Sequence, residues 1–525
     1  MELWLSVVVG ALLVVLWKYW EQWWYWENKG VADVKPLPLF GSFLDVAFKR
    51  NNIAVVVEKI YNNHPGKRYI GYYEFTKPVL MIKDPELIKQ ICIKDFDVFP
   101  EHNPFVLEEL DPLWSNTLFA VGAKKWKDLR TALSPAFTAS KMRLMFGLMD
   151  DVAKDHTSYY RANQDIELKD LFSRFTNDVI ASAAFGVRCD SLRERENRFY
   201  MAGKKASNFS GVQILKIFGM KNVPWVIKML KLRLFDQKMV DFFSQVISYN
   251  IKQREEGGIY RPDMIQLLLT ARKTGLSYDD DAKNVAETGF GVAKSVEPAK
   301  AWRATKRDFT DEDIMSQALV FFLGGFETTS NLVCHVVYEL ALNPEVQEKL
   351  TKEIDETIGT TDTELTYEKI AEMKYLDMVV SEALRKWPPA IVTDRRCVKR
   401  YVVPAQREGE TDLILEKGSV VLLPMWAMHR DPKYFPNPEK FDPERFNEVN
   451  RKNVDQGCYF PFGVGPRSCI GSRFAILETK ILVTRLLQKF QFAPTKRTQM
   501  PLKLTKKALL LQPDDGFWLA LMTRT

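Results

Sequence analysis

The sequence predicts a mainly α-helical protein with small β-sheets and a single N-terminal transmembrane anchor. Helical periodicity runs through most of the 525 residues. Segments rich in aromatic, β-branched and turn residues are confined to residues about 67–83, 395–424 and 500–522, which predicts few and short strands. An uncharged apolar run opens the chain. We therefore expect an anchor over residues 1–26, a proline-containing linker over 27–45 and one large domain over 46–525.

The apolar run extends from Leu3 to Trp17. It approaches the ~20 residues that span a bilayer when it is continued through Trp20, because a lysine near a helix end can reach the interface. Interface-favouring aromatic residues then follow at Trp20, Trp23, Trp24, Tyr25 and Trp26. Since basic residues stand on the C-terminal side of the run, the remainder of the chain is expected in the cytosol. A cleaved signal peptide is the alternative, but its basic start and small-residue cleavage site are missing.

The overall composition indicates a globular chain, with 46% hydrophobic and 27% charged residues. The net charge of +7 suits an anionic surface or an acidic partner, but it is too small to indicate nucleic-acid binding. The six cysteines are scattered without C-x-x-C spacing, which argues against a disulfide framework or a zinc finger and favours a reducing compartment. They are Cys92, Cys189, Cys334, Cys397, Cys458 and Cys469.

The boundaries of three elements can be predicted more precisely. Residues 67–83 predict a β-hairpin with its turn at Lys77-Pro78. Thr310 is a good N-cap for a long helix whose apolar pattern continues to Leu342 and stops at Asn343-Pro344. Residues 274–309, which precede this helix, are polar and charged and predict a long exposed loop.

The middle of the long helix reads GGFETT over residues 324–329. Two glycines inside a helix cost about 1 kcal/mol each relative to alanine. An acid and two β-branched threonines follow directly, and packing alone would not require this combination. The segment therefore predicts a place where a ligand approaches the helix backbone closely.

A second unusual segment, residues 462–471, reads FGVGPRSCIG and leads into a helix that begins near Ser472. Its glycines allow a tight loop beneath a flat ligand. Cys469 stands just before the helix, where unpaired N–H groups and the helix dipole favour a thiolate. A structural turn with a buried free cysteine is the alternative, and Cys469 taken alone would favour it.

The complete pattern decides between these readings. Residues 462–471 match F-x-x-G-x-R-x-C-x-G at every fixed position, and here the chain resembles the cytochrome P450 family. Residues 382–385 match E-x-x-R, 443–446 match P-E-R-F, 126–130 match W-x-x-x-R, and 324–329 match the oxygen-activation stretch. Five elements in the right order extend the resemblance over nearly the whole chain.

The resemblance implies the cytochrome P450 fold and haem b, with the thiolate of Cys469 as the metal ligand of the iron. A thiolate ligand favours O–O cleavage. The arginine of P-E-R-F would complete a buried, structural charge triad with Glu382 and Arg385. The expected cofactor-binding residues are Cys469, Trp126, Arg130, Arg467, Phe462, Gly463, Gly324, Gly325 and Ile470.

The expected catalytic residues are Glu327 and Thr328. Thr328 would hydrogen-bond to oxygen at the haem, and Glu327 would relay protons to it. The alternative is that both side chains only satisfy the backbone of their own helix.

The implied reaction inserts one atom of O₂ into a lipophilic small molecule. No P-loop or dinucleotide fingerprint is present, so we expect electrons to come from NADPH through NADPH–cytochrome P450 reductase, with cytochrome b5 as a second donor. Details of the sequence are most similar to insect microsomal members that oxidise xenobiotics, which implies the endoplasmic reticulum membrane. The alternatives are an endogenous lipid, steroid or hormone as substrate, a haem-thiolate isomerase or dehydratase, or a non-catalytic haem carrier or gas sensor.

The resemblance also implies contact surfaces. Aromatic residues that would either contact the substrate or belong to the plain core are Phe105, Trp114, Phe119, Phe321 and Phe322, and residues 209–232 would border a membrane-dipping entrance. A basic surface for an acidic reductase, or merely a solvated face, is expected from Lys124, Lys125, Lys127, Arg451, Lys452 and Arg473. The chain departs from many relatives at Val392, where a propionate-binding arginine or histidine is common.

Overall fold

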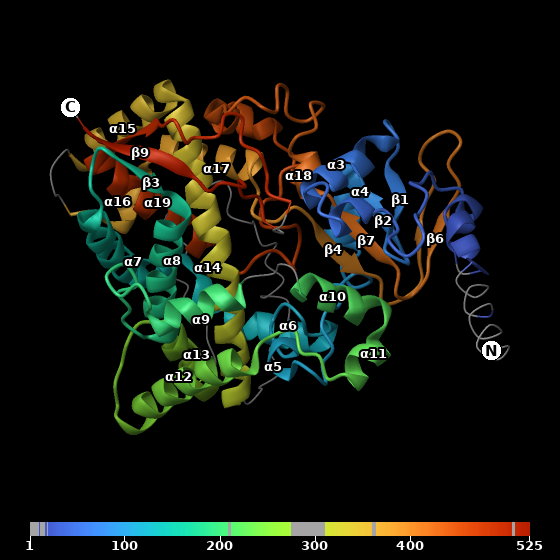
Figure 1. The fold of residues 1–525 in the computed structure, drawn as a ribbon, viewed down its shortest axis with the longest axis horizontal. Coiled ribbons are helices and arrows are strands. Elements are labelled where there is room, and N and C mark those ends of the chain that lie inside the picture. The colour runs from blue at the N-terminus through green and yellow to red at the C-terminus, as the bar shows by residue number, and fades with distance from the viewer. Residues whose placement is uncertain are drawn as a thin grey trace, which may run out of the picture.

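The structure is a computed structural model, and it describes residues 10, 16, 17, 19–207, 212–274, 310–359, 364–506 and 510–524. A large helical body lies on one side and a smaller β-rich region on the other (Figure 1). The predicted mainly helical architecture with small sheets is confirmed. The loop expected over residues 274–309 lies outside the described residues from position 275 onward, as does most of the expected anchor.

The helical body is built around α14 (Asp311–Leu342), which runs across the molecule (Figure 1). The other helices of the body are α7 (Ala139–Tyr159), α8 (Leu168–Phe185), α9 (Arg198–Ala206), α12 (Gln237–Glu256), α13 (Met264–Thr274), α15 (Pro344–Ile358), α16 (Tyr367–Glu372), α17 (Lys374–Lys386) and α19 (Ser472–Lys489). Beside the body or in the β-rich region lie α2 (Leu44–Ala47), α3 (Ile53–Asn63), α4 (Pro85–Lys89), α5 (Pro112–Ser115), α6 (Ala123–Leu133), α10 (Val212–Asn222), α11 (Pro224–Met229) and α18 (Met425–Met428).

Single-turn helices occupy several connections: η1 (Glu27–Lys29), η2 (Gln90–Lys94), η3 (Ser134–Phe137), η5 (Pro443–Phe446) and η6 (Asn450–Asn453). The strands are β1 (Tyr69–Glu74), β2 (Lys77–Ile82), β3 (Gln164–Glu167), β4 (Thr393–Arg396), β5 (Tyr401–Val403), β6 (Leu413–Leu415), β7 (Val420–Leu423), β8 (Phe490–Pro494) and β9 (Trp518–Thr523). They form sheets ordered β1-β2-β7-β4, β3-β9-β8 and β5-β6.

The predicted hairpin forms, but its turn is not at Lys77-Pro78. Glu74 pairs with Lys77, so the turn is the two-residue segment Phe75-Thr76, and the proline lies inside β2. Phe75 adopts a positive φ of 58°, which the sharp turn requires and which its residue type did not suggest. The sequence-based prediction was wrong here because it assigned the turn to the proline.

The long helix is confirmed at both ends. The Thr310 side chain accepts from the Asp313 N–H while the Asp313 carboxylate accepts from the Thr310 N–H, which is a capping box. The helix ends at Asn343, directly before Pro344, because proline cannot continue the hydrogen-bond ladder. Within the described part of the chain, α14 is the one helix long and apolar enough to cross a membrane, and most of its apolar stretch is buried in the protein.

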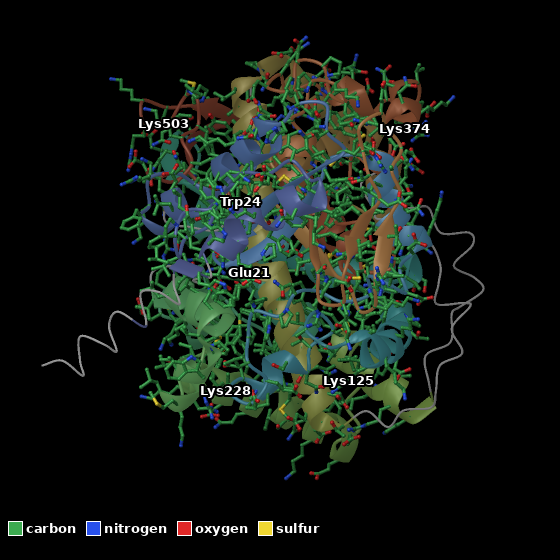
Figure 2. The ribbon with its side chains drawn as sticks, turned by 90° about the vertical axis from the view of Figure 1, so that its right-hand side faces the viewer. Glu21, Trp24, Lys125, Lys228, Lys374 and Lys503 are labelled. Atoms are coloured by element: carbon green, nitrogen blue, oxygen red, sulfur yellow. The ribbon has the colours of Figure 1, made fainter. Side chains whose placement is uncertain are left out.

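The segment between the expected anchor and domain lies against the β-rich region, onto which Figure 2 looks directly. Trp26, placed at the membrane boundary by the sequence, is 2% exposed, and its Nε1–H donates to the Tyr72 carbonyl at 3.3 Å. Gly71 lies beneath the indole, where a Cβ would overlap the ring. Asp33 forms a bridge with Gly71 as well, so residues 26–33 are packed onto β1.

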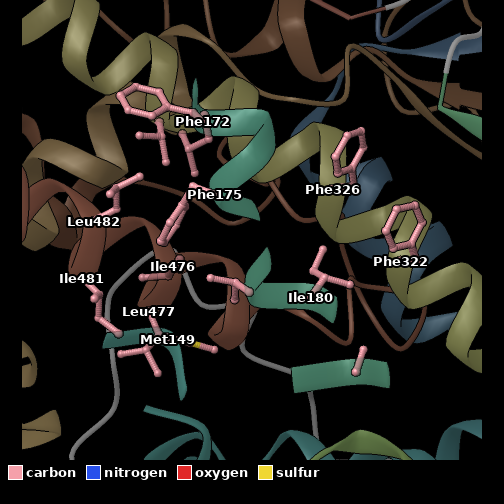
Figure 3. Packing of buried hydrophobic residues seen from close by; sticks show 14 of the residues in the cluster. Met149, Phe172, Phe175, Ile180, Phe322, Phe326, Ile476, Leu477, Ile481 and Leu482 are labelled. Atoms are coloured by element: carbon pink, nitrogen blue, oxygen red, sulfur yellow. The ribbon is translucent and has the colours of Figure 1, made fainter. Parts of the chain in front are cut away.

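The main core joins α14 to α7, α8 and α19. Figure 3 shows Phe322 and Phe326 of α14 near Ile180 of α8, with Ile476 and Leu482 of α19 beyond. The two phenylalanine rings stack with centroids 5.4 Å apart. Phe322 is fully buried in this cluster, so it does not face a substrate as expected. Phe321, one position earlier on the helix, points to a different face.

Two buried acids in this core have opposite surroundings. Glu382 accepts from Nε and Nη2 of Arg385 at 2.8 Å, and Arg445 Nε lies 3.5 Å from the same carboxylate, which is the predicted triad. Glu478 of α19 is also fully buried, but neither of its oxygens has a hydrogen-bond partner among the described residues. Burial raises the pKa of Glu478 well above the usual range, which favours the protonated form of this side chain.

Candidate active site

A cavity of about 460 Å³ lies between α14 and the loop that precedes α19. All nine residues predicted to bind the cofactor line it, and Thr328 lines it as well. Its walls are largely apolar, with contributions from α6, α8, α14 and β4. A cavity of this size and character is typical of a site for a small molecule or cofactor.

One wall is the loop 462–471, which is closed by the Cys469 N–H donating to the Phe462 carbonyl at 2.8 Å. Gly463 and Gly465 adopt φ values of 82° and 73°, a region that favours glycine. At Gly465 a Cβ would overlap the carbonyl oxygen of Cys92, so no larger residue fits. The loop therefore presents the cysteine in one defined position.

The sulfur of Cys469 is accessible from the cavity, whereas Cys92, Cys334, Cys397 and Cys458 are buried and Cys189 is half-buried. Surrounding protein still raises the pKa of the Cys469 thiol, while a hydrogen bond from the Gly471 N–H and the charge of Arg130 act in the opposite direction. A metal ion would deprotonate such a thiol. Of the six cysteines, Cys469 is the one placed to bind a ligand.

Arg467 joins this loop to the segment before α6. Its Nε–H donates to the Pro100 carbonyl at 2.7 Å, Nη1 donates to Leu118 and Phe119, and Nη2 donates to Val121 at 3.0 Å. Four of its five N–H donors are thus used by backbone carbonyls. The guanidinium carbon also lies 4.4 Å from the centroid of the Trp126 ring. Burial and the nearby Arg395 and Arg130 lower the pKa of Arg467 to about 8.

The opposite wall is the middle of α14. A Cβ on Gly324 would meet no atom within 4 Å, because the cavity lies directly above it. On Gly325 a Cβ would come within 2.6 Å of Ile180 Cδ1. Thr328 Oγ1 donates to the Gly324 carbonyl, and Thr329 Oγ1 is buried without a hydrogen-bond partner in the described chain. This wall leaves open space where the sequence predicted a close ligand.

Glu327 lies on the other side of the helix and does not line the cavity. Its carboxylate accepts from Lys169 Nζ of α8 at 2.6 Å, and the same ammonium donates to Ser330 Oγ at 2.7 Å. Both side chains of the ion pair keep nearly a fifth of their surface exposed. The two predicted catalytic residues thus stand side by side in sequence, one facing the cavity and one facing α8.

Positive charge gathers at one edge of the cavity. Arg395 of β4 is fully buried, and its Nη2 donates to the Val464 carbonyl of the cysteine loop at 2.9 Å. Its Nε has no hydrogen-bond partner among the described residues. Arg130 and Arg467 line the cavity, whereas Arg395 lies behind its wall. Val392, where many relatives carry a basic residue, is an apolar part of its wall.

Sequence reasoning missed Lys169, and it left open whether Arg395 or Arg396 substitutes for a basic residue at position 392. The partner of Lys169 is 158 residues away, and no local pattern links the two. Arg395 stands in the strand pattern 393–396, whose alternation could have shown that it points away from Asp394 and Arg396. The predicted aromatic set is divided: Phe119 and Phe321 line the cavity, whereas Phe105 and Trp114 do not.

The predicted basic surface is divided as well. Lys125 lies towards one end of the molecule and Lys374 towards the other (Figure 2). Lys374 pairs with Glu448 at 2.7 Å, close in sequence to Arg451 and Lys452. The six basic residues are therefore spread over three elements, with Lys124, Lys125 and Lys127 on α6, Arg451 and Lys452 on η6, and Arg473 on α19.

Comparison with known proteins agrees with this geometry. The family described as Cytochrome P450 matches residues 32–520. The chain is 39% identical to "Cytochrome P450 9e2" of Blattella germanica, covering 99% of this chain and 97% of that protein. It is 40% identical to "Probable cytochrome P450 9f2" of Drosophila melanogaster, covering 95% of each. It is 34% identical to "Cytochrome P450 6k1" of Blattella germanica, covering 99% and 97%.

Proposed function

Since this chain belongs to the cytochrome P450 family and is a monooxygenase of that family, we propose that it oxidises lipophilic xenobiotics with electrons from NADPH. One observation carries this proposal: an accessible cysteine sulfur faces the open space above Gly324 and Thr328 across an apolar cavity. The membership implies haem as the cofactor. Haem would lie as a flat group between these two walls, with its propionates toward Arg130 and Arg467.

Cys469 is the proposed ligand of the haem iron. A haem held by a thiolate supplies O₂ activation by favouring O–O cleavage. The Gly471 N–H donates to this sulfur, which stabilises negative charge on it and would tune a bound metal. Phe462, Gly463 and Ile470 line the cavity together with Cys469.

The arginine edge is proposed to hold the haem propionates. Arg130 lines the cavity from α6, Arg395 has an unpaired buried Nε, and Arg467 retains one N–H. Guanidinium groups pair well with carboxylates, and a buried cationic cluster favours an anionic partner. Arg395 would thus bind a propionate in place of the basic residue that many relatives carry at position 392. The variant Arg395→Met should release haem faster to an acceptor apoprotein, with Arg400→Met as an exposed control.

Protons are proposed to reach the cavity through Glu327 and Thr328. Glu327 receives a proton on the α8 side, where it contacts Lys169 and keeps some exposure to water. Thr328 Oγ1 now donates to the Gly324 carbonyl, and by rotating it can donate into the cavity instead. Thr328→Ala should therefore consume NADPH and release peroxide without forming product in proportion.

We also propose how the domain receives electrons and how it contacts a membrane. Electrons would arrive through NADPH–cytochrome P450 reductase, with cytochrome b5 as a second donor, at the basic groups on α6 and near η6. Residues 1–26 would anchor the domain, through the linker 27–45, in the endoplasmic reticulum membrane. Exposed apolar side chains of α10 and α11 would contact the same membrane: Val212, Leu215, Trp225, Met229 and Leu230.

The first experiment is a carbon-monoxide difference spectrum of the reduced protein. A thiolate-ligated iron places the Soret band far to the red of a histidine-ligated one. Cys469→Ser should abolish the thiolate band, and Cys458→Ser, which changes a buried cysteine of the same region, should keep it. A histidine-type spectrum from the folded native protein would contradict the proposal.

The second experiment measures turnover of lipophilic compounds, including insecticides and plant toxins, with NADPH and reductase. Product that depends on NADPH supports the monooxygenase reaction. Turnover of steroids or lipids alone would assign an endogenous substrate. Product from a hydroperoxide without NADPH would instead indicate the isomerase reaction.

A further inference from the structure

A second cavity lies outside the one that holds the proposed haem site. This outer pocket has a volume of about 520 Å³ and is formed by residues of the segment 102–125 and the first turn of α14. His102 and Phe119 line both cavities. Their rings stack with centroids 4.7 Å apart and planes at 11°. The wall between the two cavities therefore includes these two flat side chains.

The outer pocket has an aromatic surface. The ring centroids of Phe105 and Trp114 are 5.6 Å apart, those of Phe105 and Phe119 are 6.2 Å apart, and those of Trp114 and Phe119 are 6.0 Å apart. Three aromatic rings in mutual contact along one pocket offer π-faces to a ligand. Such faces attract organic cations, and ammonium groups in particular.

The charge of the pocket favours the same class of ligand. Glu108 and Glu312 line it and are exposed, and neither forms an ion pair within the described residues. Asp313 also lines the pocket but is used by the capping box of α14. The one lysine of the lining, Lys125, donates to the Asn116 side-chain oxygen. The lining is thus net negative.

His102 supplies an acceptor at the inner end. Its Nδ1 lies 2.9 Å from Asp394 Oδ1, and its side chain is 10% exposed. The carboxylate fixes the proton on Nδ1, so Nε2 carries a lone pair. Nε2 makes no hydrogen bond in the described chain. A protonated amine that enters the pocket can donate to this nitrogen while its apolar part lies against Phe119.

We propose that the outer pocket binds the ammonium end of a lipophilic amine and that His102 and Phe119 admit such molecules to the inner cavity. The enzyme then favours cationic lipophilic amines over neutral molecules of the same shape. This inference deepens the proposed function and rests on it, because the inner cavity must hold the haem at which the amine is oxidised.

The test uses the purified holoenzyme and two matched ligands, N-dodecylpiperidine, which is protonated at pH 7, and dodecylcyclohexane. Dissociation constants are measured from the change in the haem absorbance, and KM from product formation. We expect the amine to bind about tenfold tighter, with a preference that shrinks as salt is added. Equal affinity for the two ligands would overturn the inference.

Substitutions in the outer pocket test whether the preference for the amine arises there. The double variant Glu108→Gln with Glu312→Gln should bring the ratio of the two affinities close to one. Glu345→Gln is the matched control, since Glu345 is also an exposed acid in the first turn of a helix, α15. His102→Phe keeps a flat ring beside Phe119 but removes the acceptor, and it should reduce the preference for the amine. A double variant with undiminished preference would also overturn the inference.

The carbon-monoxide spectrum distinguishes a failure of the amine preference from a failure of the proposed function. A thiolate-type spectrum with turnover of the neutral ligand but no amine preference would refute the inference and leave the proposed function intact. A histidine-type spectrum of the native protein would refute the proposed function itself. If His102→Phe fails to fold, the glutamate variants still decide the question.

Discussion

The two walls of the haem cavity are built on opposite principles. The cysteine loop is determined by contacts: Gly465 lies directly beneath the Cys92 carbonyl, and Arg467 donates to four backbone carbonyls. The α14 wall instead lacks contacts: the space above Gly324 is open, and the Thr329 hydroxyl has no hydrogen-bond partner among the described residues. The first wall can be specified by the protein alone, whereas the second is completed only by a ligand. Substitutions in the two walls should therefore fail in different ways.

The largest effect is expected in the loop. Gly465→Ala combines a left-handed backbone, which costs roughly 1–2 kcal/mol for a non-glycine residue, with overlap on the Cys92 carbonyl. Haem content measured per protein should fall to a small fraction of the native value. Gly463→Ala shares the positive φ, but its Cβ would lie 3.7 Å from the nearest atom, so it should lose much less haem. Equal losses in both variants would show that strain, and not overlap, determines the loop.

The next effect is expected on the α14 wall and has a different form. Gly324→Ala adds a methyl group to open space and improves helix propensity by about 1 kcal/mol. The haem-free protein should become slightly more stable to urea, while turnover of large substrates falls severalfold. Gly325→Ala meets Ile180 at 2.6 Å and should gain no stability. A loss of stability in Gly324→Ala would contradict the open wall.

A third effect concerns α19, which continues the cysteine loop. The pKa of Glu478 is raised in the folded protein, so its contribution to stability is fully present below its unfolded pKa of about 4.3 and is lost as pH rises. In thermal unfolding, the stability of Glu478→Gln relative to the native protein should therefore increase from pH 5 to pH 8. Near pH 4 the two proteins should be equally stable. The exposed Glu348→Gln serves as control. A difference that does not depend on pH would mean that Glu478 finds a partner.

The smallest effect is expected at the unpaired hydroxyl. Thr329→Val keeps the shape of the side chain and removes a buried hydroxyl that lacks a hydrogen bond, so the free energy of unfolding should rise by roughly 1 kcal/mol. Thr328→Val removes a hydroxyl that donates to Gly324 and should not stabilise the protein. Denaturant titrations of the haem-free variants measure both values. Destabilisation by Thr329→Val would indicate a water or a ligand on that oxygen.

Much of the fold could be read from local patterns. The ends of α14 follow from a capping box and a proline, both of which act within a few residues. The start of α19 and the pairing of Glu382 with Arg385 follow in the same way. The strands β3 and β8 were missed, because β3 is short and polar and both depend on pairing with β9.

The direction in which a side chain points was harder to predict than the helix or strand that carries it. Phe321 and Phe322 were expected in one cavity, but neighbouring residues of a helix are rotated by about 100° and only Phe321 lines it. For the same reason Glu327 faces α8 while Thr328 faces the cavity. Contacts with distant partners, such as Lys169 and Arg395, have no signature in a single sequence.

The strand β4 has a consequence for how molecules can enter. Arg396 pairs with Glu101, and Asp394 accepts from the Asn103 N–H at 2.7 Å, so residues 101–103 are fastened to the sheet. Further along, Gln317 accepts from the Leu118 N–H at 2.8 Å, which fastens the other end of the segment to α14. Between these points, the side chain of Asp111 accepts from the backbone of Leu234. Residues 104–110, the outer lip of the pocket, are held in addition by the exposed ion pair between Glu109 and Lys228 at 2.7 Å, so a molecule that enters here would part this surface contact while the arginines below stay in place.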